Sequence, residues 1–190
     1  MTEYVYHLVP EELKGEYLIP LNELKRVYPN LYDEYIQKYK DHTQREHLLT
    51  RKIPKLECFW NDVVHFLPIH PYQIYKELKG LGVNISTNKL FYKIPITLLN
   101  SQQVAIYKYS KLNWNGAGGE LKDCEIEIIN LHEYRELKQL NPCTKEYYRV
   151  EHQNGRRFGM FHLIPHVLVK GKVEVKNIEI INWSIAPVNG

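Results

Sequence analysis

Four histidines occur in two closely spaced pairs, and imidazole is a common metal ligand and proton carrier near neutral pH. His65 and His70 flank a short apolar segment, and Asp62 lies just upstream. His162 and His166 are four residues apart in strand-like sequence, so both would point to the same face. Neutral imidazoles suit zinc, iron and nickel, and one hypothesis is a metal-dependent hydrolase that uses these four histidines. The alternative is four partly buried histidines bonded to backbone or carboxylate groups, because no helical HExxH motif occurs.

A cysteine or serine nucleophile has little support in this sequence. The GxSxG motif is absent, and Cys58 lies in an apolar strand-like segment, where a thiol is usually inert. Cys58, Cys124 and Cys143 are odd in number and widely spaced, with no CxxC pair. The pattern therefore indicates neither a disulfide framework nor a thiolate zinc site.

A polar break and two arginines form a second group of candidates. Trp60-Asn61-Asp62 interrupts a hydrophobic run, and a polar pair there marks either a bulge or turn, or a binding site. Arg45 and Arg51 precede this run. Arginine beside a cleft can clamp a phosphate through two hydrogen bonds, whereas at a helix end it is more often a solvated charge.

Charge and composition narrow the class of partner. The net charge is +3, and no run of lysine and arginine is longer than two residues. Nucleic acid is therefore a possible partner, but the charge pattern does not support it. No apolar run is long enough to cross a bilayer, and the first residues do not resemble a signal peptide, so we expect a cytoplasmic protein. The 15 tyrosines among 190 residues favour half-buried amphipathic surfaces, with a ring-stacking surface as the alternative.

The elements expected in the first half are mainly helical. The sequence predicts a strand that ends at Pro10, a short helix closed by Pro29, and an amphipathic helix capped by Asn30. A capping box from Thr43 to Glu46 predicts another short helix. Residues 53–68 are expected to form one or two buried strands, and His70-Pro71 then opens a helix.

Strands are expected to dominate from residue 89 onward. The predicted strands lie in the segments KLFYKIPITLL, QVAIYKY, CEIEIIN, HVLVKGKVEVK and NIEIINW, with HEYRELKQL as a lone short helix. Asn154-Gly155 predicts a hairpin turn between EYYRVEH and RRFGMFHL. The order of elements indicates a single α+β domain over residues 1–190, with helices mainly from the N-terminal half.

The order and spacing of these segments resemble the ADP-ribosyltransferase fold, in particular the DarT-type toxins that modify DNA. That family begins with a strand that carries a histidine after an aromatic residue, here Tyr6-His7. It places an arginine ahead of a hydrophobic strand and a proline-led helix, as Arg45 or Arg51 precedes VVHFLPIHPYQIYKEL. It ends with a glutamate and short strands, which match PHVLVKGKVEVKNIEIINW. The likeness covers most of the chain as an order of elements, with few identical residues.

The resemblance implies split antiparallel sheets that hold NAD or a related nucleotide in a cleft. It implies that His7 contacts a ribose, that Arg45 or Arg51 meets a phosphate, and that an aromatic ring stacks on the ligand. The candidates for that ring are Tyr6, Trp60 and Tyr75.

His166 occupies the position of the family's catalytic glutamate. As an imidazolium it would repel positive charge that develops at the ribose. The hypothesis is therefore an ADP-ribosyltransferase-like protein that is catalytically degenerate, and the sequence leaves open whether the chain is an enzyme.

A non-catalytic interaction module is the remaining alternative. Tyr32, Tyr35 and Tyr39 would form one face of the first long helix. Because aromatic residues are enriched in interface cores, this face would bind another protein or a second copy of the chain as a homodimer.

Overall fold

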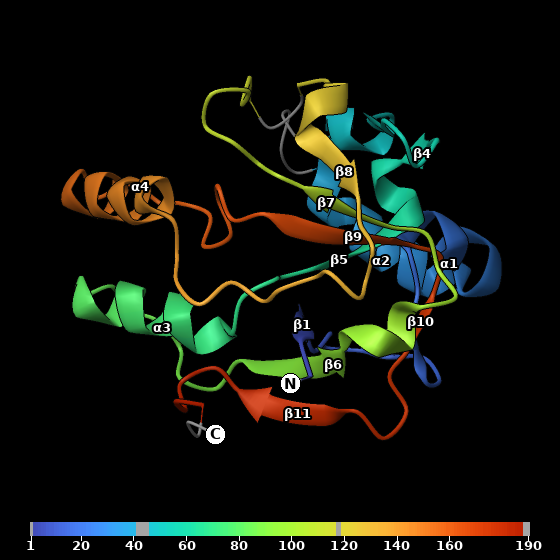
Figure 1. Ribbon diagram of the computed structural model, residues 1–190, viewed down its shortest axis with the longest axis horizontal. Coiled ribbons are helices and arrows are strands. Elements are labelled where there is room, and N and C mark those ends of the chain that lie inside the picture. The colour runs from blue at the N-terminus through green and yellow to red at the C-terminus, as the bar shows by residue number, and fades with distance from the viewer. Residues whose placement is uncertain (1, 41–45, 117–118, 188–190) are drawn as a thin grey trace.

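Two antiparallel sheets form the framework of the computed structural model, which describes residues 2–40, 46–116 and 119–187 (Figure 1). The three-stranded sheet has the order β1 (Tyr4–Leu8), β6 (Leu90–Pro95) and β11 (Glu179–Asn182). The four-stranded sheet has the order β5 (Val63–Phe66), β9 (His166–Lys170), β7 (Val104–Tyr107) and β8 (Ile126–Ile128). Antiparallel sheets combined with helices confirm the α+β class.

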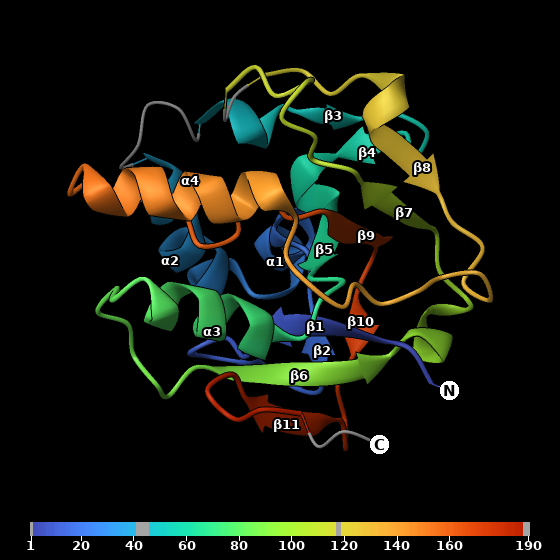
Figure 2. The same cartoon turned by 60° about the vertical axis from the view of Figure 1, so that its left-hand side comes forward.

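Within the described residues, one backbone bridge joins the edge strands of the two sheets. Tyr6 of β1 and Leu67, just after β5, exchange two backbone hydrogen bonds of 3.0 and 2.8 Å. Beyond this bridge the strands part, and Figure 2 shows β5 running away from β1. The segments that lie between β1 and β5 beyond the bridge therefore fill a space that widens with distance from it.

Three apolar clusters hold the layers together. Alternation along the strands sends Val5, Ile94 and Val167 into a cluster shared by the two sheets. The other face of the four-stranded sheet is covered by the hairpin of β3 (Lys52–Ile53) and β4 (Cys58–Phe59). The third cluster joins Tyr6 and Phe91 to residues of two helices and to Trp183.

The helices lie on two sides of this framework. In Figure 1, α3 (Pro71–Gly80) and α4 (Pro142–Gln153) lie at the left, and α1 (Leu21–Val27) and α2 (Pro29–Lys40) at the right. Short 3-10 turns are η1 (Glu46–Leu49), η2 (Trp60–Asp62), η3 (Ile96–Leu99) and η4 (Asp123–Glu125). A small pair of strands, β2 (Tyr17–Leu18) and β10 (Val173–Glu174), completes the fold.

The helix boundaries in the first half agree with the sequence, with small corrections. His70 caps α3, since its Nδ1 accepts a hydrogen bond from the backbone N–H of Tyr72 at 3.2 Å. The second helix begins at Pro29, so Asn30 is inside its first turn and is not its cap. Thr43 of the expected capping box lies outside the described residues, whereas Glu46 begins η1.

The helix expected in HEYRELKQL is wrong. The backbone there makes tertiary hydrogen bonds instead: the N–H of Leu137 donates to the carbonyl of Pro68 at 2.7 Å, and the N–H of Glu136 donates to Glu3 at 2.7 Å. These bonds replace the local ones that a helix needs.

The hairpin expected at Asn154-Gly155 is also wrong. The segment EYYRVEH belongs to α4, which is capped by Asn141 and starts with proline at its first position. Gly155 has φ +61° and terminates that helix, a use of glycine as common as the hairpin turn. His162 consequently lies outside any strand, and the expected shared strand face of His162 and His166 does not form.

Candidate functional site

Three partly buried imidazoles follow each other where the two sheets part. His7 is on β1, His65 on β5 and His166 at the start of β9. The rings of His65 and His166 are 6.3 Å apart, and His65 also interacts with the charge of His7. Among the described residues no ring contact or electrostatic interaction is found between His7 and His166, whereas each of them interacts with His65.

Each of these imidazoles donates one ring N–H to a backbone carbonyl. His7 Nδ1 bonds the carbonyl of Leu8 at 2.6 Å, and His166 Nδ1 bonds that of Ile164 at 2.7 Å. His65 Nε2 bonds the carbonyl of Trp60 at 3.0 Å. Since a carbonyl only accepts, these contacts fix the tautomers.

Burial keeps the three rings neutral. Loss of hydration lowers the pKa of His7 to about 4 and that of His166 to about 4. The same cause, with the charge of His166 next, lowers the pKa of His65 to about 3. At neutral pH the second nitrogen of each ring therefore carries a lone pair and can accept a hydrogen bond.

Arg51 extends this histidine row on the side of Trp60. The indole of Trp60 lies 4.4 Å from the ring of His65, and the guanidinium of Arg51 lies 4.8 Å from the indole. Arg51 also lies 5.8 Å from the ring of Tyr107. Within the described part of the chain its Nε is buried without a hydrogen-bond partner, an arrangement that favours an external acceptor.

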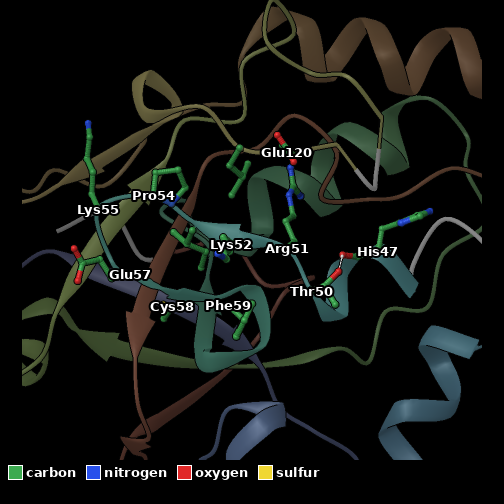
Figure 3. Close-up of a pocket in the computed structure, with 12 residues that line it drawn as sticks. His47, Thr50, Arg51, Lys52, Pro54, Lys55, Glu57, Cys58, Phe59 and Glu120 are labelled. Atoms are coloured by element: carbon green, nitrogen blue, oxygen red, sulfur yellow. Dashed lines mark hydrogen bonds between the residues drawn. The ribbon is translucent and has the colours of Figure 1, made fainter.

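A cavity of about 820 Å³ opens beside Arg51 (Figure 3). Figure 3 shows Arg51 extending toward Glu120, while His47 and Lys55 point to opposite sides. Lys55 is held by a 2.6 Å bond from its Nζ to the carbonyl of Ile126. A volume of this size falls within the range of small-molecule sites.

A second, smaller cavity of about 200 Å³ lies where β1 and β5 separate. His7 and His65 both line it, together with Asn61 and the tyrosines Tyr35 and Tyr39. Trp60 contacts both Arg51, which lines the larger cavity, and His65, which lines the smaller one.

His162 belongs to an aromatic cluster next to the row. Its Nδ1 lies 2.9 Å from the hydroxyl of Tyr109, and its ring lies 4.1 Å from Tyr147 and 4.8 Å from Trp114. Burial lowers the pKa of His162 and raises the pKa of Tyr109 to about 12. The Tyr109 ring is 6.0 Å from that of His166, which joins the cluster to the row.

The residues that the sequence singled out fall into two groups. Arg51, Trp60 and His166 belong to one continuous set of contacts through His65, and His7 adjoins it. Tyr6 and Tyr75 lie in the cluster on the other face of β1. Tyr6 is 1% exposed and its hydroxyl donates to Glu136 Oε1 at 3.0 Å, so its ring offers no face to a ligand. Tyr75 packs 5.4 Å from Trp183.

Arg45 lies outside the described residues.

The four histidines of the metal hypothesis do not form one site. His70 lies edge-on to Tyr6, 5.2 Å away, and its Nδ1 caps α3. Across the described ranges, no group of three or more histidine, cysteine or acidic side chains is arranged to hold a metal ion.

The tyrosine face expected on the second helix turns partly inward. The hydroxyl of Tyr35 donates to the carbonyl of Glu12 at 3.0 Å, and that of Tyr39 donates to Asn61 Oδ1 at 3.1 Å. Tyr32 instead lies under Lys25, whose Nζ is 5.9 Å from the ring centre. Tyr35 and Tyr39 therefore line the smaller cavity and do not form an outer binding face with Tyr32.

Sequence reasoning missed the tyrosines Tyr107 and Tyr109 and the pairing of Asn61 with Tyr39. Tyr107 and Tyr109 stack with their rings 4.9 Å apart. The segment VAIYKYS places them two residues apart, a spacing that puts two rings on one face of a strand, although β7 ends at Tyr107 and Tyr109 has φ +45°. No local signal connects Asn61 to Tyr39.

Comparisons of the chain with protein-family models, curated proteins and solved structures found no match. In the part of the chain that the structure describes, no helix is both long and apolar enough to span a membrane.

Proposed function

We propose that this chain is an ADP-ribosyltransferase-like protein that binds NAD or a related nucleotide beside Arg51. The observation that carries the proposal is the Arg51 guanidinium, stacked on Trp60 at the large cavity with its Nε buried and unpartnered. A planar guanidinium suits a phosphate oxygen, because it offers several donors in one plane. Trp60 packs against this guanidinium, 4.8 Å from the centre of the indole ring.

His166 would then accept a hydrogen bond from a ligand hydroxyl. Its neutral state removes the repulsion of developing positive charge that an imidazolium would cause. The same low pKa makes His166 a weak base at pH 7. We therefore expect nucleotide binding with little or no transfer of ADP-ribose.

Thermal unfolding in NAD tests the proposal. Ligand at about 100 times its dissociation constant should stabilise the protein by about 2.7 kcal/mol. We expect millimolar NAD to raise the melting temperature, and Arg51→Met to abolish the rise. Arg26→Met on α1 is the control, because Arg26 is exposed and its ion pair with Glu23 is long at 3.8 Å.

An unchanged melting temperature at millimolar NAD, or an equal shift in the Arg51 variant, would contradict the proposal. Release of nicotinamide from NAD, followed by chromatography, separates binding from catalysis. Release no faster than in buffer is expected for the degenerate form of the hypothesis.

A further inference from the structure

The smaller cavity has apolar walls and a few defined polar groups. It lies between His7 on β1 and residues 63–65 on β5, and the segment 10–21 with helices α1 and α2 closes it. The aliphatic side chains in its wall are Leu13, Leu18, Ile19, Leu21, Leu24, Leu31, Val63 and Val64. Cavities of about 150 Å³ with such walls bind benzene, so about 200 Å³ accommodates a small ring.

Asn61 provides one unsatisfied donor in this wall. The residue is 3% exposed, and its Oδ1 accepts a 3.1 Å hydrogen bond from Tyr39. Its Nδ2 is buried and has no partner among the described residues. A buried amide N–H without an acceptor destabilises a protein, so its persistence points to an acceptor supplied from outside.

His7 and His65 provide the acceptors. His7 uses Nδ1 on Leu8 and His65 uses Nε2 on Trp60, which leaves the lone pairs of His7 Nε2 and His65 Nδ1. The charged residues of the lining are Glu12 and Lys14, which pair with each other. Asn61, His7 and His65 thus offer one donor and two acceptors, and the two charged residues of the described lining compensate each other.

We propose that this cavity binds a small uncharged ring that carries an amide group. The amide carbonyl accepts from Asn61 Nδ2, and the amide N–H donates to an imidazole of His7 or His65. A carboxylate of the same shape is rejected, because it would place its charge against two lone pairs, and the one cation among the described lining residues, Lys14, is paired with Glu12. The amide belongs either to the ring, as in uracil, or to a carboxamide on the ring, as in benzamide.

This inference does not depend on NAD binding beside Arg51. Arg51 lines the larger cavity and is not part of the smaller one, whose lining includes Asn61, His7 and His65. Loss of NAD binding in Arg51→Met and loss of amide binding in an Asn61 variant are therefore separate results.

Calorimetric titration of the intact protein with benzamide, uracil and benzoate tests the proposal. Benzamide or uracil should bind at millimolar concentration, and benzoate, the charged counterpart of benzamide, at least about tenfold more weakly. If benzamide alone binds, the cavity recognises an amide attached to the ring. If uracil alone binds, it recognises an amide within the ring. No binding of either amide, or equal binding of benzoate, overturns the proposal.

Asn61→Leu separates the amide contact from the apolar walls. It removes the unpartnered donor but keeps a side chain of similar size, so binding should fall about tenfold or more. Asn100→Leu, at an exposed position outside the lining, is the matched control and should bind as before.

A measurement on the unaltered protein covers the case in which Asn61→Leu fails to fold. In ¹⁵N-labelled protein, benzamide or uracil should shift the side-chain amide signal of Asn61 and leave that of Asn100 in place. A titration in which the Asn61 signal stays fixed while the ligand binds overturns the assignment.

Discussion

Each imidazole of the row is tied to a carbonyl close to it in the sequence. His7 bonds the next residue and His166 bonds the residue two positions earlier, whereas His65 bonds Trp60. These short links hold the rings in place while burial keeps them uncharged. The row is therefore a set of hydrogen-bond acceptors at pH 7 and a source of instability in acid.

Stability should decrease as the pH falls from about 6.5 toward 4. The unfolded chain takes up protons on these histidines near pH 6.5, while the folded protein resists protonation down to a pKa of about 4 for His7 and His166. Since the unfolded state binds more protons in this window, each histidine lowers stability by about 1.4 kcal/mol per pH unit. Urea unfolding at a series of pH values measures the slope.

His166→Gln should reduce this slope by about one proton relative to the parent protein. His132→Gln, at an exposed position, is the control and should leave the slope unchanged. An identical slope for His166→Gln and the parent would show that His166 is not kept neutral by the fold.

At the residue scale, the sequence singled out Arg51, Trp60 and His166 as candidates, and they belong to one set of contacts. Their side-chain chemistry is visible in the sequence. What brings them together is the register of β5, β9 and β7, which opposes His65 to Leu168 and His166 to Tyr107. Register is decided between segments far apart in the chain, so sequence reasoning does not reach it.

At the scale of elements, α4 shows how two local signals compete. Asn154-Gly155 fits a hairpin turn, but Asn141-Pro142 fits a helix start, and the helix forms. Asn141 uses both ends of its amide: Oδ1 accepts from the N–H of Thr144 at 2.8 Å, and Nδ2 donates to the carbonyl of Leu163 at 2.7 Å. The cap thus also fastens α4 to the segment that leads to β9.

Asn141→Ala should destabilise the protein by about 2 kcal/mol, because it removes the cap and the donor to Leu163. Asn141→Asp keeps the acceptor for Thr144 and should lose less. Chemical unfolding followed by circular dichroism measures both. Asn154→Ala at the other end of α4 is the control and should stay within about 0.5 kcal/mol of the parent; a similar loss there would contradict a specific role of the cap.

Strands and helices with clear periodicity were predictable, and segments governed by tertiary contacts were not. The strand at Tyr4–Leu8 and the helix that His70-Pro71 opens follow from alternation and capping. The segment 132–140 has helical composition, but Pro68 and Glu3 take its backbone N–H groups. Hydrogen-bond partners that are distant in the chain give no signal in the local sequence.

At the scale of the whole molecule, one apolar cluster belongs to both sheets. Val5 and Ile94 of the three-stranded sheet lie in the same cluster as Val64 and Val167 of the four-stranded sheet. Neither sheet can lose this contact without exposing apolar surface of the other. The two sheets should therefore unfold together, as expected for the single domain over residues 1–190.

Single-tryptophan variants test this cooperativity. Trp60 reports on the four-stranded sheet, and Trp183, fully buried against Phe91, reports on the three-stranded sheet. Replacing the other tryptophans by phenylalanine leaves one reporter at a time. Their urea midpoints should coincide with each other and with circular dichroism in each variant, and separate midpoints for Trp60 and Trp183 would indicate two independent units.

The backbone bridge between Tyr6 and Leu67 also joins the edge strands of the two sheets at one point. Its two hydrogen bonds join backbone groups, so substitutions in the lining of the smaller cavity should leave this connection between the sheets intact. Exchanging the side chains around His7 and His65 should therefore alter which ligand is accepted without separating the two sheets.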